Sequence, residues 1–160
     1  MLKVYTDGAC KKNPGPGGWG IYCLFPDSSI QEMWGWEENT TNNRMELMAV
    51  IKALEIFGDL EKTIYTDSQY VCKGVYEWLP GWKKNDWQNS KKKTVLNQDL
   101  WKRLDALWQE CSFKTRLEWV KGHSGDPGNE KADALANRGV YDLLDKADKI
   151  LNNLWIKNTN

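Results

Sequence analysis

The chain has 160 residues, and its 22 lysines and arginines balance 22 aspartates and glutamates, so the formal net charge is zero. This length suits one domain with a sizeable core, and the overall balance gives no sign of a polyanionic partner. No apolar run approaches the roughly 20 residues of a membrane span, which excludes a membrane-spanning protein.

The first third of the chain predicts three strands and then a helix. Residues 2–7, 19–25 and 30–36 are rich in β-branched and aromatic types, and turns are expected at 15–18 and 26–29. Such short turns favour an antiparallel meander. Residues 43–57 change to helical spacing, with Met45, Met48 and their neighbours on one stripe.

The rest of the chain alternates between helices and single strands. We expect a strand over 63–66, a helix over 68–79 that ends before Pro80, a helix over 98–110 and a strand over 117–120. Asp126 and Pro127 indicate the start of a further helix, with Asp as N-cap and Pro in the first position. The order βββ-α-β-α-α-β-α predicts one α/β domain, in which helices cover a mixed sheet.

Two predicted strands end in nearly the same string, Tyr-Thr-Asp, which places Asp7 and Asp67 at the carboxyl ends of their strands. In open α/β sheets, ligands bind outside those ends. If the two strands are neighbours, the carboxylates lie side by side, and they repel each other unless a cation is present. Oxygen ligands favour Mg²⁺ or Mn²⁺ over zinc.

Each candidate acid also has an ordinary structural interpretation. Asp67 could be a helix N-cap, and Asp7, which precedes a glycine, could be a turn residue. Asn43 and Glu46 resemble a capping box, with Asn at the N-cap and Glu three positions later. Asp133 lies beside the apolar stripe of the last core helix and could be a solvated flank residue. The functional interpretation therefore depends on all four acids together.

Six strings carry a family resemblance. They are Thr-Asp-Gly-Ala-Cys at 6–10, Asn-Pro-Gly-Pro-Gly-Gly at 13–18, Thr-Thr-Asn-Asn-Arg-Met-Glu-Leu at 40–47, Thr-Asp-Ser-Gln-Tyr-Val at 66–71, Trp-Val-Lys-Gly-His-Ser-Gly at 119–125 and Asn-Glu-Lys-Ala-Asp at 129–133. Their order and spacing resemble those of the type 1 ribonucleases H of bacteria, from residue 1 to about residue 139.

The resemblance implies a ribonuclease H-like fold, which is a five-stranded mixed β-sheet flanked by α-helices, with the strands of Asp7 and Asp67 as neighbours. The resemblance places a catalytic domain at 1–139, and a helical tail is expected at 140–160. It also implies that Asp7, Glu46, Asp67 and Asp133 bind metal, and that His123 is a mobile-loop histidine that helps protons or product leave. Histidine exchanges protons near neutral pH, which suits that accessory role.

The implied activity is that of an endoribonuclease acting on the RNA strand of RNA–DNA hybrids, with 5′-phosphate and 3′-hydroxyl products. Two Mg²⁺ ions in the substrate complex, for which Mn²⁺ can substitute, would clamp the attacking and departing oxygens. Asp7 is expected to bridge the two ions, with Glu46 and Asp67 on one ion and Asp133 on the other.

Substrate contacts are expected at side-chain amides. The RNA 2′-hydroxyl both donates and accepts hydrogen bonds, and amides do the same. By resemblance, the hybrid is contacted by Asn13, Asn42, Asn43 and Gln69, and the positions near its grooves and phosphates are Cys10, Thr41, Trp78 and Trp82. Turn and cap chemistry is the alternative interpretation of the amides. Nothing indicates base readout, so low sequence specificity is expected.

Residues 82–93 combine lysines with tryptophans. Lysines neutralise phosphates and tryptophans offer flat surfaces to sugars and bases, so we expect hybrid contacts from Lys83, Lys84, Trp87, Lys91, Lys92 and Lys93. The alternative is a solvated loop flanked by core tryptophans. By resemblance, this segment is the basic protrusion that grips the DNA strand. Asn85, Asp86 and Gln88 stand where basic residues or glycine are common, which predicts weaker or more salt-sensitive binding.

The tail has apolar residues at 140, 143, 144, 147, 151 and 154, a spacing typical of an amphipathic helix. We expect it to dock on its own domain, and a partner-binding helix is the alternative. The sequence names no protein partner for it.

Four cysteines, at positions 10, 23, 72 and 111, show neither metal-ligand spacing nor the density of a disulfide scaffold. Free thiols in a reducing cytosol are the simplest interpretation, and the first residues are typical of a strand rather than a signal peptide. We therefore expect a cytoplasmic monomer with an RNA–DNA hybrid duplex as partner and no membrane association.

Three other functions fit parts of the pattern. A module that binds hybrids without cutting them is disfavoured by the complete set of acids. An integrase or resolvase on the same architecture is disfavoured by Asn42, Asn43 and Gln69. A protein with a structural Ca²⁺ site would bind metal without turnover. Cleavage of a hybrid with and without Mg²⁺ separates these alternatives.

Overall fold

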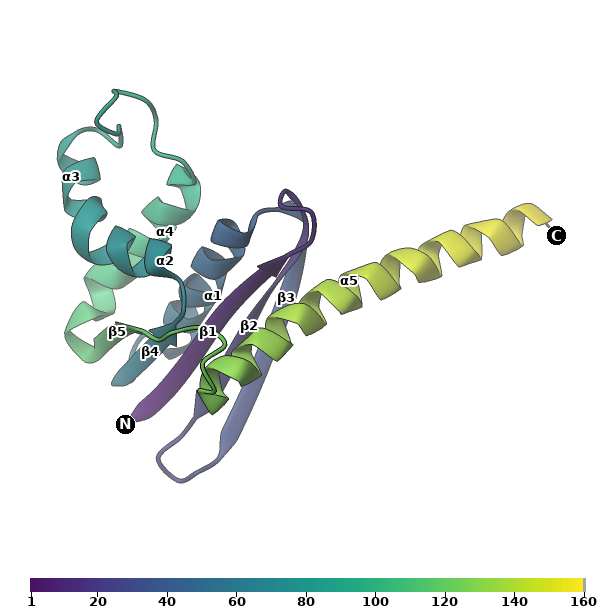
Figure 1. Cartoon of the computed structure of the whole chain (residues 1–160), viewed down its shortest axis with the longest axis horizontal. Coiled ribbons are helices and arrows are strands. Elements are labelled where there is room, and N and C mark those ends of the chain that lie inside the picture. Colours follow the sequence, from purple (N-terminus) through teal and green to yellow (C-terminus); the bar gives the residue numbers. More distant parts are fainter. Residues whose placement is uncertain (160) are drawn as a thin grey trace.

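The computed structural model describes residues 1–159, with side chains up to Lys157. Its centre is a five-stranded sheet in the order β3-β2-β1-β4-β5 (Figure 1). The strands are β1 (Leu2–Cys10), β2 (Gly15–Leu24), β3 (Ile30–Thr40), β4 (Lys62–Thr66) and β5 (Thr115–Trp119). The first three strands form the predicted antiparallel meander, whereas β4 and β5 run parallel to β1. The expected mixed sheet is confirmed.

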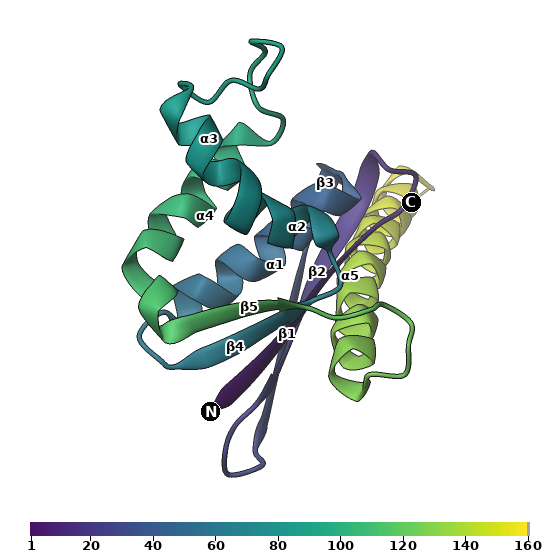
Figure 2. The same cartoon turned by 60° about the vertical axis from the view of Figure 1, so that its left-hand side comes forward.

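Helices cover both faces of this sheet (Figure 2). On one face, α1 (Asn42–Phe57) packs against β1 and β2, and α4 (Gln98–Cys111) packs on α1. On the other face, α5 (Pro127–Thr159) crosses β1, β2 and β3. The core between sheet and helices holds fully buried aliphatic side chains, among them Val4, Ile21, Leu47, Ile51 and Ile64. Apolar burial of this extent is the main contribution to the stability of the fold.

Two local predictions are wrong. Residues 15–18 belong to β2 rather than to a turn, since Gly17 and Gly18 pair with β1 and β3. The helix predicted over 68–79 does not end at Pro80. It continues as α2 (Gln69–Lys73), a π-helical turn η1 (Gly74–Trp78) and α3 (Leu79–Lys84). Pro80 lies in the first turn of α3, where a missing N–H breaks no helical hydrogen bond.

The last helix starts as predicted, because Asp126 Oδ1 accepts a hydrogen bond from Asn129 N at 3.0 Å. It then runs unbroken past residue 140 and leaves the body of the molecule (Figure 1). Docking is confirmed for Val140 and Leu143, which are buried, and is wrong for Leu151 and Leu154, whose side chains are 63% and 53% exposed. The division at residues 139 and 140 stays a prediction. None of the helices within residues 1–159 is apolar and long enough to span a membrane.

Candidate active site

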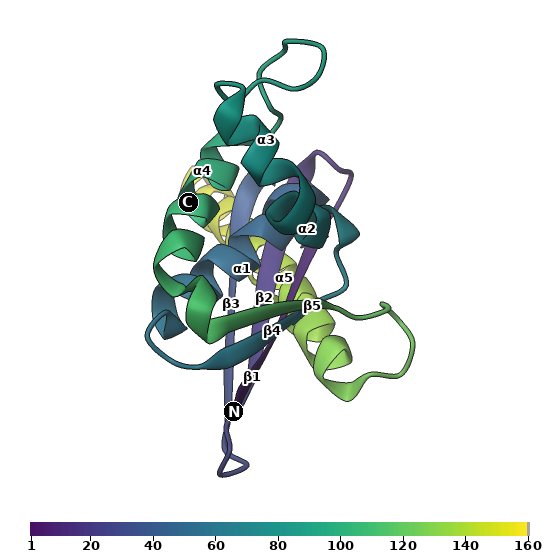
Figure 3. The same ribbon diagram turned by 90° about the vertical axis from the view of Figure 1, so that its left-hand side faces the viewer.

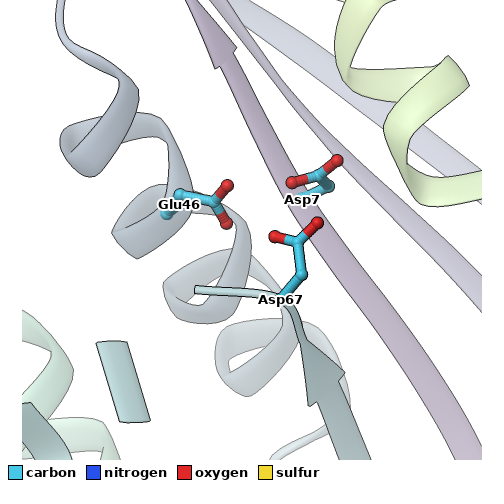
Figure 4. Close-up of side chains that lie close together, drawn as sticks. All are labelled: Asp7, Glu46 and Asp67. Carbon is cyan, nitrogen blue, oxygen red and sulfur yellow. The ribbon is translucent and has the colours of Figure 1, made fainter. Parts of the chain in front are cut away.

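Three carboxylates meet where β4 ends beside β1 in the middle of the sheet (Figure 4). Asp7 lies in β1, Asp67 directly follows β4, and Glu46 lies in the second turn of α1. One oxygen from each group lies within 4.8 Å of the others. The sequence prediction that Asp7 and Asp67 lie side by side is confirmed, because β1 and β4 are parallel neighbours with Thr6 opposite Thr66.

Gly8 explains how Glu46 reaches Asp7 from a different layer of the fold. A Cβ at position 8 would lie 2.4 Å from the backbone nitrogen of Glu46 and 2.9 Å from Met45 Cβ. Any side chain there would push α1 away from β1. The glycine after Asp7 therefore lets the helix approach the strand, so that the Glu46 carboxylate reaches the Asp7 side chain.

The fourth acid, Asp133, comes from the opposite layer. Asp7 pairs across the sheet with Gly20, and a Cβ at Gly20 would lie 2.5 Å from both Ala132 O and Ala136 N. The close approach of α5 to β2 at this glycine brings Asp133 near enough to Asp7 to add to the rise in the pKa of the Asp7 carboxyl group. Asp133 is not one of the three carboxylates grouped within 4.8 Å. The pKa of Asp7 is thus raised by acids from both layers, Glu46 and Asp133.

Burial makes this cluster electrostatically unfavourable on its own. Asp7 and Glu46 are only 3% and 4% exposed. Loss of water, followed by the charge of Glu46, raises the pKa of Asp7. Loss of water is also the main cause of the raised pKa of Glu46. Both shifts mean that negative charge is costly here without a compensating cation.

The same residues fit a hard divalent cation. Glu46 Oε2 is buried and has no hydrogen-bond partner within the described part of the chain, which is unusual for a buried charged group. Oxygen-only donors of this kind suit Mg²⁺ or Mn²⁺. A cation at the cluster would satisfy the unpartnered oxygen and offset the repulsion between the acids.

The capping interpretations of two acids are wrong. The N-cap of α2 is Ser68, whose Oγ accepts a hydrogen bond from Val71 N at 3.1 Å. The N-cap of α1 is Thr41, whose Oγ1 accepts from Arg44 N at 3.2 Å. Neither Asp67 nor Glu46 is therefore needed to cap its helix, and both side chains turn to the cluster.

Asp67 is held by neighbours that sequence reasoning missed. Asn129 is buried at the start of α5, and its Nδ2 lies 3.4 Å from Asp67 Oδ2. Trp119 Nε1 donates to the Asp67 carbonyl at 3.0 Å. The only available signal for Asn129 was its place one helical turn before Asp133 in the same string. A buried amide at this point orients the carboxylate.

His123 lies in the exposed connection between β5 and α5, with a φ of +54°. Its neighbour Gly122 packs against Asp67, where a Cβ would lie 2.8 Å from Asp67 Oδ2. The loop therefore borders the cluster. Among the contacts found within residues 1–159, none joins His123 to a carboxylate, so its accessory role stays a prediction.

The predicted substrate-binding amides are exposed and lie near the start of α1 and α2. Asn13 Oδ1 accepts a hydrogen bond from Asn42 N at 2.9 Å, which joins the β1–β2 turn to the first turn of α1. Cys10 Sγ lies 3.4 Å from Thr40 O, in the same corner. Asn43 and Gln69 are exposed near the first turns of their helices. The exposed side chains of Asn42, Asn43 and Gln69 leave polar atoms available to a ligand.

The lysine-rich segment forms α3 and the loop 85–97, which projects beyond the sheet (Figure 3). All five predicted lysines are exposed, and Lys83 forms an ion pair with Asp105 at 3.3 Å. Trp82 and Trp87 are half-buried and pack against the core, and the Trp82 ring lies 5.3 Å from that of Trp101. Core packing accounts for part of each ring, and the hybrid contacts expected of these two tryptophans stay a prediction.

Comparisons with known proteins found similar sequences and similar folds. A family model described as RNase H matches residues 1–141. The chain is 57% identical over 144 residues to Ribonuclease H of Dechloromonas aromatica (strain RCB), covering 89% of this chain and 95% of that protein. Among solved structures, one similar fold is that of LC9-RNase H1, a type 1 RNase H with the type 2 active-site motif. The two structures have a TM-score of 0.69 at 31% sequence identity, and the matched region covers 88% of this chain and 72% of the LC9-RNase H1 chain. The foamy viral protease-reverse transcriptase in complex with RNA/DNA hybrid has a TM-score of 0.78 at 26% identity, over 88% of this chain and 20% of the viral one.

Proposed function

The chain belongs to the RNase H family and is an enzyme of that class, and we propose that it cuts the RNA strand of RNA–DNA hybrids by hydrolysis with two divalent cations. The observation that carries the proposal is the convergence of Asp7, Glu46 and Asp67 within 4.8 Å, with Asp133 beside Asp7. The viral relative in complex with an RNA/DNA hybrid supports the substrate class. The products proposed are 5′-phosphate and 3′-hydroxyl ends.

The four acids would hold the cations, which are Mg²⁺ in our proposal, with Mn²⁺ able to substitute. When bound, two such ions activate a water for attack and stabilise the departing oxygen of a phosphodiester. Glu46 and Asp133 both raise the pKa of Asp7, so Asp7 is our candidate to help hold both ions. Glu46 and Asp67 would help to hold one ion and Asp133 the other.

The remaining predicted residues bind and orient the substrate. The amides of Asn13, Asn42, Asn43 and Gln69 can donate to and accept from the RNA 2′-hydroxyl, which distinguishes RNA from DNA. The lysines of 83–93 neutralise phosphates of the other strand. His123, at the border of the cluster, would exchange a proton with the departing group or with solvent.

Two further features belong to the same proposal. All four cysteines are free thiols, which supports a cytoplasmic location. We also propose that the chain acts as a monomer, since one copy supplies all four carboxylates.

The test is cleavage of a labelled hybrid with Mg²⁺, with Mn²⁺ and with chelator. Matched double-stranded DNA and double-stranded RNA serve as substrate controls, and the Asp7→Asn variant serves as the site control. The proposal expects metal-dependent cleavage of the RNA strand of the hybrid alone, with fragments that a phosphatase alters at their 5′ ends. Metal binding without turnover would instead indicate a structural cation site.

A further inference from the structure

The sheet has one long edge strand whose outer side is open. β3 runs over 11 residues, and within residues 1–159 it pairs only with β2. The other edge strand, β5, is different, because the Tyr76 hydroxyl donates to Leu117 O at 2.9 Å and accepts from Leu117 N at 3.2 Å. No such side-chain bond reaches the backbone of residues 30–39 in the described part of the chain. An open edge of this kind can pair with an extended segment of another chain.

Two hollows, one on each face of the sheet, meet this edge at Trp36. The α1-side hollow is a cavity of about 450 Å³ between β3 and helices α1 and α4, and its lining includes Trp19, Glu37 and Met48. The α5-side hollow is a cavity of about 390 Å³ between Trp36 and the outer part of α5, and its lining includes Ile150. Successive side chains of a strand point to opposite faces. A strand added beside Trp36 would therefore place neighbouring side chains in the two hollows.

The path of α5 creates the second hollow. The helix packs tightly on β3, since a Cβ at Gly139 would lie 2.2 Å from Gly35 O. About two turns later, Lys146 Nζ lies 6.0 Å from the centre of the Trp36 ring. Beyond this point the helix passes the edge of the sheet (Figure 1), and Ile150 is 51% exposed. An apolar side chain of an added strand would be covered by Trp36 and Ile150.

The charges of β3 limit which segment can pair with it. The strand contains three glutamates and neither lysine nor arginine. These are Glu32, Glu37 and Glu38. None of them takes part in an ion pair within residues 1–159. A second copy of β3, paired antiparallel about Gly35, would set Glu32 opposite Glu38, and like charges opposite each other destabilise a sheet. The edge therefore favours a basic segment over a second copy of this chain.

The cations that line the two hollows already have partners. Lys52 and Arg103, in the α1-side hollow, both pair with Glu55. Lys149, in the α5-side hollow, pairs with Asp145 at 3.0 Å, and the fourth cation is the lysine over the tryptophan ring. An incoming lysine or arginine therefore meets glutamates that form no ion pair with a cation of this chain.

We propose that the outer edge of β3 binds an extended segment of a partner protein in which a lysine or arginine stands next to a large apolar residue. The segment pairs with β3 as a sixth strand. Its basic residue lies across from Glu37, with the aliphatic stem on Trp19 and Met48. Its apolar neighbour lies between Trp36 and Ile150. This interaction goes beyond the proposed function, because it needs neither a cation nor a hybrid.

The experiment measures binding of labelled probe peptides to the full chain in chelator, by fluorescence anisotropy. The probe is a blocked peptide of about ten residues, the upper length of ordinary strands, in which lysine alternates with leucine. One control has the same sequence with methyl groups on alternate backbone nitrogens, and the other replaces each lysine by glutamate. The lysine peptide should bind, the methylated peptide should not bind because it has lost its strand donors, and the glutamate peptide should bind far more weakly.

Two matched pairs of variants place the peptide on the chain. Ile150→Asp should raise the Kd of the lysine peptide about tenfold, because it puts a charge in an apolar contact. Leu151→Asp, at a more exposed neighbour that does not line the hollow, should leave it unchanged. Glu37→Lys should raise the same Kd about fivefold and lower that of the glutamate peptide. Glu118→Lys, at an exposed glutamate of β5, should change neither.

Four results would overturn the inference. Equal binding of the methylated peptide would mean general charge attraction without strand pairing. Equal effects within either pair of variants would place the peptide elsewhere. Self-association of the wild-type chain that Ile150→Asp abolishes would make a second copy the occupant. Absence of any binding at about 1 mM lysine peptide, an affinity of roughly 4 kcal/mol, would leave the edge without the proposed partner.

Discussion

Glu46 lies against Asp7 with both carboxyl groups withdrawn from water, and one Glu46 oxygen has no hydrogen-bond partner among the residues described. Two buried acids at this separation destabilise the metal-free fold, because desolvation and mutual repulsion both oppose their charged forms. Such an arrangement is stable at neutral pH only with a proton or a cation between the groups. The relationship favours a cation at this site and makes the titration of the two carboxyl groups measurable.

Asp7→Asn should abolish nearly all cleavage and keep the fold. The amide retains the shape of the side chain but removes one charge from a site built for two cations. A loss of about 4 kcal/mol of charge stabilisation corresponds to roughly a thousandfold in rate. Single-turnover cleavage with Mg²⁺ measures it, with circular dichroism as the folding control. Retention of more than a tenth of wild-type activity would contradict the central role of Asp7.

The metal-free protein should lose stability as the pH rises from about 4 through neutrality. The folded-state pKa values of Asp7 and Glu46 are raised, whereas unfolded carboxyl groups ionise near pH 4. Between these values the folded state holds more protons than the unfolded state, so the free energy of unfolding falls with pH. Thermal unfolding in chelator from pH 4 to 8 measures this effect.

Asp7→Asn and Mg²⁺ are the two controls for that titration. The variant should show a flatter pH dependence and a higher Tm than wild type in chelator, because the repulsion between acids is reduced. Mg²⁺ should raise the wild-type Tm, since a ligand that binds only the folded state stabilises it, and it should raise that of the variant less. Equal pH profiles for both proteins would mean that the cluster does not govern the effect.

His123→Ala should slow turnover by roughly tenfold to a hundredfold and leave clear activity, in line with the lower range of proton-transfer contributions. Because residue 123 has a φ of +54°, alanine also strains the loop. His123→Asn removes the titrating ring but suits a left-handed backbone. Equal losses for the two variants would assign the effect to the imidazole. A loss as deep as that of Asp7→Asn would contradict an accessory role.

The repeated string marked Asp7 and Asp67, and the family resemblance supplied the neighbouring strands that bring them together. The predicted strand end at Asp7 is wrong, because β1 continues to Cys10 and the two acids meet through the pairing of Thr6 with Thr66. The sequence was not sufficient for the helix caps. Thr41 and Ser68 cap the helices where Asn43 and Asp67 had been the candidates. Capping side chains one or two residues apart are chemically equivalent, and only the backbone path decides between them.

Long-range polar contacts were also beyond the sequence pattern. Asn129 lies against Asp67, and Asn97 joins Arg44 to Tyr70, yet an isolated asparagine is most often a turn or cap residue. The tail shows a similar limit. The apolar spacing of the tail correctly indicates a helix with one apolar face. The spacing of apolar residues carries no information on where the sheet beneath that face ends, so it could not show which part of the helix is docked.

Leu143→Asp and Leu151→Asp form a matched pair that tests where the tail is docked. Leu143 is 7% exposed and Leu151 is 63% exposed, on one continuous helix. A buried unpaired charge at 143 should cost about 3 kcal/mol and lower the Tm by roughly 10 °C. The same change at 151 should stay within about 0.5 kcal/mol of wild type, as is usual for exposed sites. A large drop in Tm for Leu151→Asp would show that the outer part of the helix is covered in solution.

Alanine at Lys83, Lys84, Lys91, Lys92 and Lys93 together should weaken hybrid binding far more than it slows chemistry. The lysines are exposed on α3 and the loop after it and are distant in sequence from the three grouped carboxylates. We therefore expect them to stabilise the bound substrate and the transition state equally. Removing interactions that are equally strong in the bound substrate and in the transition state raises KM and leaves kcat nearly unchanged. Lys83 is already paired with Asp105, so Lys83→Ala alone should have the smallest effect of the five.

Salt dependence gives the second measurement for the same variant. Removal of each lysine that neutralises a phosphate should flatten the slope of log Kd against log salt by roughly 0.9 on a B-like duplex. The weakening should be the same for hybrids of different base sequence, because phosphate contacts carry no sequence information. Normal KM with an unaltered slope would make the segment an ordinary solvated loop. Normal KM with a greatly reduced kcat would mean that the lysines act on the transition state. The assignment of these lysines to substrate binding alone would then be wrong.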